Sequence, residues 1–118
     1  MFEYKAIVKK IVDADTIDVD IDLGFKMKTE QRLRLARVDA WEVRGEERVK
    51  GLKAKEFVED VIPVGTRVTV RTEKTGKYGR YIAEVIYMPK SIEEFKENGM
   101  LNLSDELLRA GHATLYEG

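Results

Sequence analysis

TIDVDIDL, residues 16–23, alternates strictly between apolar and acidic side chains after its first threonine. A period of two places successive side chains on opposite faces of a β-strand. The apolar side chains therefore face a core and the three aspartates face away from it. We expect a half-buried antiparallel strand that ends at Gly24.

The outward aspartates, Asp18, Asp20 and Asp22, are spaced like a ladder of carboxylates. Such a ladder is either a metal site or a solvated face that resists pairing with another edge strand. The pattern favours the solvated face.

Similar strand patterns lie on both sides of this stretch, separated by turns and by one helix. The helix is expected from about Glu47 to Val61, because its apolar residues recur at helical spacing and Pro63 follows it. A short final helix is capped by Asn102 or Ser104. The further strands are expected at residues 2–12, 26–38, 66–72 and 81–87.

Five strands with a helix after the third are typical of a small Greek-key barrel of the oligonucleotide-binding type, the OB-fold. We therefore predict a β-rich α+β protein with this barrel and a short C-terminal helix. The 118 residues suit one domain, residues 1–118.

Composition excludes several classes of protein and site. No apolar run approaches the roughly 20 residues of a membrane span, and the chain has no cysteine. The single histidine, His112, is expected to be structural, so any bound metal is a hard cation such as calcium or magnesium. The start of the chain predicts a cytoplasmic protein, or a secreted one if a signal peptide has been removed.

Charge is unevenly distributed, although the net charge is only -1. Residues 13–22 carry five aspartates and no base. Residues 43–55 carry five bases against two acids, and residues 71–80 carry four bases against one acid. Local basic segments, not the whole molecule, are therefore expected to attract nucleic acid.

In the stretch RLARVDAWE, residues 34–42, an apolar strand is followed by charged residues. The strand alternation shifts at Ala36-Arg37-Val38, and a kink there re-aims Asp39. Taken alone, the charged residues are equally well explained as solvated groups at a strand end.

In the predicted barrel, this stretch meets the turn at Asp15 and the loop ending in Arg80. Two aspartates and a carbonyl oxygen can hold a hard cation, and a glutamate can activate a nearby water. Two arginines can clamp a phosphate. These are the components that phosphodiester hydrolysis requires.

Four motifs together resemble the staphylococcal nuclease (thermonuclease) family over nearly the whole chain. They are VDADT (12–16), RLARVDAWE (34–42), KYGR (77–80) and LLRAG (107–111). The resemblance implies a five-stranded barrel with a calcium-dependent nuclease activity on DNA and RNA that leaves 3′-phosphate ends. Single-stranded nucleic acid is the expected partner, and no membrane is expected.

The same resemblance implies a role for each matching residue. Asp15 and Asp39 correspond to the calcium carboxylates, and Ala40 to the residue that binds through its main-chain carbonyl. Glu42 corresponds to the candidate general base. The phosphate-binding arginines correspond to Arg34 and Arg80, and the residues touching a neighbouring phosphate to Lys77 and Tyr78.

Two departures bear on these roles. Trp41 stands where the family usually has proline, so either the turn is less rigid or the indole stacks on a base. Arg37 replaces a commonly apolar residue. Trp41 and the unremarkable net charge leave an alternative function open, a catalytically weak or inactive OB-fold module that binds nucleic acid or protein.

Overall fold

The computed structural model describes residues 2–75 and 81–116, with only the main chain at 73–75. The stretch TIDVDIDL lies in β2 and pairs antiparallel with β1 on one side and β3 on the other. The barrel is built from β1 (Phe2–Asp13), β2 (Thr16–Gly24), β3 (Met27–Leu35), β5 (Arg67–Thr75) and β6 (Tyr81–Tyr87).

The barrel closes where the first and last strands of the order β3-β2-β1-β5-β6 pair with each other. This β3–β6 seam is parallel, with Leu33 opposite Tyr81 and Leu35 opposite Ala83. Closure removes the free edges on which other chains pair. The predicted five-stranded OB-fold barrel is confirmed.

The alternation of β2 produces the expected two faces, with two differences. Ile17, Val19 and Ile21 are buried in the core, whereas Leu23, near the end of the strand, is 48% exposed. Asp18 is also largely buried, because its carboxylate accepts hydrogen bonds from Arg32 Nε at 2.8 Å and Nη2 at 3.1 Å. The aspartate face is therefore neutralised in part by a cross-strand arginine.

The strand predicted at residues 26–38 is in fact two strands. β3 ends at Leu35, and β4 (Val38–Ala40) begins after a turn in which Arg37 has φ 69°. Non-glycine residues rarely adopt this left-handed conformation. The shift in alternation thus marks a sharp turn that redirects the chain ahead of Asp39.

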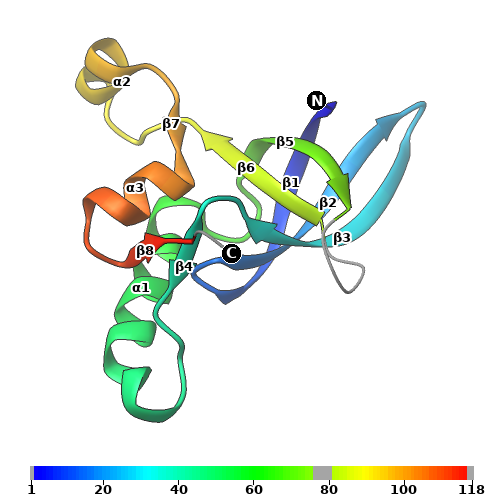
Figure 1. Cartoon of the computed structure of the whole chain (residues 1–118). Helices are drawn as coiled ribbons and strands as arrows, with labels where there is room; N and C mark the ends of the chain where they lie inside the picture. Colours follow the sequence, from blue (N-terminus) through cyan, green and yellow to red (C-terminus); the bar gives the residue numbers. More distant parts are fainter. Residues whose placement is uncertain (1, 76–80, 117–118) are drawn as a thin grey trace.

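The helical elements gather on one side of the barrel (Figure 1). A 3-10 turn, η1 (Gly45–Glu47), leads into α1 (Arg48–Val61), which begins one residue later than predicted. The C-terminal part contains α2 (Ile92–Asn98), β7 (Leu101–Asn102), α3 (Leu103–Arg109) and β8 (Ala113–Leu115). Asn102, one of the two predicted caps, accepts hydrogen bonds from Ser104 N and Asp105 N at the start of α3.

One strand pairing in this region was not predicted from the sequence. β8 pairs antiparallel with β4, with Ala113 opposite Ala40. Within the described residues, no helix is long and apolar enough to cross a membrane.

Candidate nuclease site at the end of the barrel

Asp15 joins three segments at the end of the barrel. It lies in the turn between β1 and β2, and only 9% of its surface is exposed. Its Oδ2 accepts a hydrogen bond from Ala40 N at 3.0 Å, and its Oδ1 accepts one from Thr16 Oγ1 at 3.1 Å. Its main-chain oxygen accepts a hydrogen bond from Leu35 N at 2.8 Å. The carboxylate is therefore held against β3 and β4.

Arg34, near the end of β3, bridges the two predicted metal carboxylates. Its Nη1 lies 3.1 Å from Asp15 Oδ2, and its Nη2 lies 3.4 Å from Asp39 Oδ1. Nη1 also donates to Val38 O at 2.9 Å. Asp15 and Asp39 thus converge on a single guanidinium.

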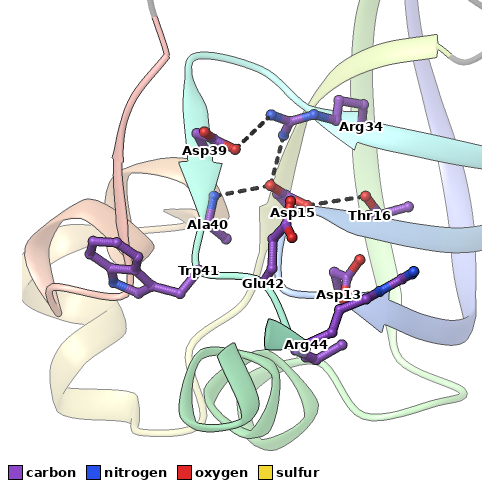
Figure 2. Close-up of a pocket in the computed structure, with 10 residues that line it drawn as sticks. Asp13, Asp15, Thr16, Arg34, Asp39, Ala40, Trp41, Glu42 and Arg44 are labelled. Carbon is purple, nitrogen blue, oxygen red and sulfur yellow. Dashed lines mark hydrogen bonds and ion pairs between the residues drawn. The ribbon is translucent and has the colours of Figure 1, made fainter. Parts of the chain in front are cut away.

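These groups line a polar pocket of about 380 Å³ (Figure 2). Glu42 extends from the segment after β4 toward the space beside Asp15 (Figure 2). Among the described residues, no hydrogen bond or ion pair involves its carboxylate. The pocket is lined by Asp13, Asp15, Thr16, Arg34, Asp39, Ala40, Trp41, Glu42, Val43 and Arg44.

Asp13 is a site residue that the sequence reasoning missed. Burial, followed by repulsion from Asp15, raises the pKa of its carboxyl, while Arg44 and Lys55 lower it. The raised pKa therefore reflects mainly the burial of this carboxyl, with a smaller contribution from the negative charge of Asp15. The signal that could have found it is the run of five aspartates, which begins at Asp13.

Trp41 ties the site to the C-terminal part of the chain. Its Nε1 donates to Gly111 O at 3.3 Å, and its main-chain N donates to His112 O at 3.5 Å. Lys50 Nζ lies 4.7 Å from the centre of the indole ring system, a cation–π contact. The indole points away from Arg34 and Asp15 (Figure 2), so in this structure it anchors the turn.

Two aromatic contacts complete the surroundings of the site. The ring of Tyr116 lies 5.4 Å from Arg34 Cζ, and Tyr116 N donates to Arg37 O at 2.8 Å. The His112 ring packs against Phe57 with centroids 5.0 Å apart, which agrees with a structural role.

The remaining predicted residues, Lys77, Tyr78 and Arg80, lie outside the described part of the chain. Within the part that is described, no three His, Cys, Asp or Glu side chains are grouped closely enough to hold a metal. A cation in the pocket would therefore depend on Asp15 and Asp39, with main-chain oxygen and water completing its ligands.

Comparison with known proteins agrees with this arrangement. The family model described as Staphylococcal nuclease homologue matches residues 32–118, well over half of the chain. The chain belongs to this family. The matched region includes Arg34, Asp39 and Glu42, whereas Asp15 precedes it.

The chain is also similar to a much longer curated protein, Endonuclease YhcR of Bacillus subtilis (strain 168). The two are 30% identical over 124 residues, which cover 97% of this chain but only 9% of that protein. Family membership supports a nuclease-type function and nucleic acid as the class of substrate. This support applies at the level of the family.

Proposed function

We propose that this chain is a calcium-dependent nuclease domain that hydrolyses phosphodiester bonds of DNA or RNA. The observation that carries the proposal is the convergence of Asp15, Arg34, Asp39 and Glu42 on one polar pocket. These residues come from four separate segments, and together they supply acidic, basic and proton-accepting groups. The endonuclease relative agrees with cleavage within a strand.

The oxygen-rich composition of the pocket fits a hard cation. Asp15 and Asp39 provide carboxylates, and the pocket lining contains neither histidine nor cysteine. Asp15, Asp39 and the main-chain oxygen of Ala40 would hold calcium. Bound calcium supplies positive charge that offsets the negative charge of the scissile phosphate.

Arg34 would stabilise the phosphate while holding both carboxylates. A guanidinium has five N–H donors. In the described structure, its Nε makes no hydrogen bond, and Nη2 makes one, to Asp39. Donors therefore remain for a phosphate oxygen, where extra negative charge develops during hydrolysis. We assign the second phosphate contact to Arg80 and contacts with a neighbouring phosphate to Lys77 and Tyr78.

Glu42 would act as the general base. A carboxylate without a protein partner is available to accept a proton from water as its oxygen attacks phosphorus. The bond from phosphorus to the 5′ oxygen then breaks, leaving a 3′-phosphate, and the departing oxygen takes a proton from solvent. Single-stranded substrate suits the pocket because an unpaired strand bends easily toward it.

The proposal is tested with a single-stranded DNA oligonucleotide, in calcium and in calcium with excess chelator. We expect cleavage only with free calcium, and we expect Asp39→Asn to lose most of it. Asp60→Asn, the same change on the exposed face of α1, should cleave like the unmodified protein. Binding without any calcium-dependent cleavage would instead indicate the binding module and overturn the proposal.

A further inference from the structure

Gly51 lies where α1 meets the segment that carries Glu42. Gly51 is buried, and an ideal Cβ at this position would overlap the main-chain carbonyl of Glu42. The same Cβ would lie 2.6 Å from Val43 N. Both neighbours are main-chain atoms, so no side-chain rotation can relieve the overlap. Any larger residue must push the segment away from α1.

Helix geometry gives no reason for glycine at this position. Glycine is among the poorest helix formers, and Gly51 lies inside α1. The other glycines that the structure describes have positive φ and open space where a Cβ would lie, so their backbone conformation explains them. Gly51 differs because a close approach of main chains requires it.

Trp41, the residue before Glu42, makes further contacts that hold the same segment. Its indole donates to Gly111 O at 3.3 Å and packs against Lys50, the residue before Gly51. The segment is therefore held by contacts at Trp41 and by the close approach of Gly51 to the main chain of Glu42. Since no described residue binds its carboxylate, the main chain alone determines where the side chain starts and which space it can reach.

We propose that Gly51 and Trp41 are positioning residues that clamp the main chain of Glu42 and so hold its carboxylate in the pocket. The inference rests on the proposed function, in which Glu42 is the general base. Asp15, Arg34 and Asp39 come from the β1–β2 turn, β3 and β4, whereas the atoms nearest to a Cβ at Gly51 belong to residues 42 and 43. Ala40, the remaining proposed ligand, is held by the pairing of β4 with β8. Displacing residues 42 and 43 therefore moves Glu42 relative to a cation and phosphate site that stays in place.

Gly51→Ala is the direct test, with a single-stranded DNA oligonucleotide as substrate. We expect kcat to fall by about tenfold to a hundredfold, because a misplacement near 1 Å can cost about that much. KM and the calcium concentration for half-maximal rate should change less than about twofold, since they depend on other residues. Val49→Ala, at an exposed position of α1, is the matched control and should retain full activity.

The sole tryptophan provides a readout that does not depend on catalysis. Trp41 precedes Glu42, so a displaced segment should alter its emission spectrum in Gly51→Ala and not in Val49→Ala. An unchanged spectrum together with unchanged kcat would overturn the inference. If the unmodified protein shows no cleavage, the proposed function fails, while the emission spectra still test the contact.

A double-mutant cycle with Glu42→Gln separates positioning from general damage. If Gly51 acts through Glu42, Gly51→Ala should lower kcat little further once Glu42 is Gln. An equal fall in both backgrounds would overturn the inference. If Gly51→Ala does not fold, Trp41→Phe decides the question, because it removes the indole N–H bond to Gly111 and shrinks the ring that contacts Lys50 while keeping an aromatic side chain. It should lower kcat in the unmodified background and not with Glu42→Gln, and equal effects in both would contradict the clamp.

Discussion

At the scale of single residues, the pocket contains carboxylates in different surroundings. Asp15 is nearly buried and has two hydrogen-bond donors and an arginine, whereas Glu42 is exposed and has no described partner. A carboxylate with several hydrogen-bond donors is stabilised in its charged form. A carboxylate without a protein partner can take up a proton from water. These surroundings support the proposed ligand role of Asp15 and the proposed base role of Glu42.

We predict that Glu42→Gln lowers kcat by about a hundredfold or more, because a positioned general base contributes about that much. The fold should be unaffected, since the side chain makes no bond to the described residues. Single-turnover cleavage and a thermal melt measure the two effects. Glu46→Gln, an exposed glutamate of η1, is the matched control. Full activity of Glu42→Gln would remove Glu42 from the mechanism.

At the scale of elements, the turn between β3 and β4 is secured by Arg37. Its guanidinium binds Glu84 of β6 in a bidentate manner and Asp105 of α3 at 2.9 Å. Asn102 Nδ2 also donates to Glu84 at 2.7 Å. The Arg37–Glu84 pair lies just beyond the β3–β6 seam. It therefore joins the end of β3, which carries Arg34, to β6, which follows Arg80 in the sequence.

We predict that Arg37→Ala lowers the free energy of unfolding by about 1 kcal/mol, through loss of partly exposed, bidentate ion pairs. Arg37→Gly loses the same pairs but relieves the left-handed conformation, so it should be more stable than Arg37→Ala by about 1 kcal/mol. Urea unfolding measures both values. Equal stabilities would show that the turn at residue 37 is unstrained.

The same pair predicts a pH dependence. The hydrogen bonds from Arg37 hold the pKa of Glu84 below its ordinary value of 4.5. A lowered pKa favours the folded state above the unfolded pKa, and this stability is lost as pH falls through the folded pKa. The loss of unfolding free energy caused by Arg37→Ala should therefore be complete at pH 7 and become smaller below about pH 4. A loss that stays constant as the pH is lowered further would exclude Glu84 as the partner.

At the scale of the whole molecule, the site exists only when the barrel is closed. Asp15 and Asp39 become neighbours through Arg34 and through the hydrogen bond from Ala40 N to Asp15. The unfolded chain does not hold these groups together. Calcium binding is therefore expected to favour the folded state.

We predict that calcium at a hundred times its Kd raises the free energy of unfolding by about 2.7 kcal/mol. A thermal melt with and without calcium measures this as a rise in Tm. Asp39→Asn should lose most of the rise, and the exposed Asp60→Asn should keep it. A rise that is the same in Asp39→Asn would place the calcium elsewhere.

Much of the barrel could be predicted from local pattern. The alternation in residues 16–23 and the Val-rich runs around it identify strands, because side-chain period and burial are linked within a few residues. The helix at 48–61 and the cap at Asn102 are predictable for the same reason. The splitting of β3 from β4 is visible only as a shift in alternation, since the turn at Arg37 depends on partners in β6 and α3.

The sequence by itself determined the approximate positions of the five barrel strands, the barrel class and the residue types of the candidate site, because these depend on period, turn residues and motif spacing. Only the tertiary structure decided that β8 pairs with β4, that Asp13 borders the pocket, and that Gly51 lies against Glu42. These contacts arise where separate elements pack against one another. Their geometry is set by barrel closure and helix packing, and no local pattern encodes it.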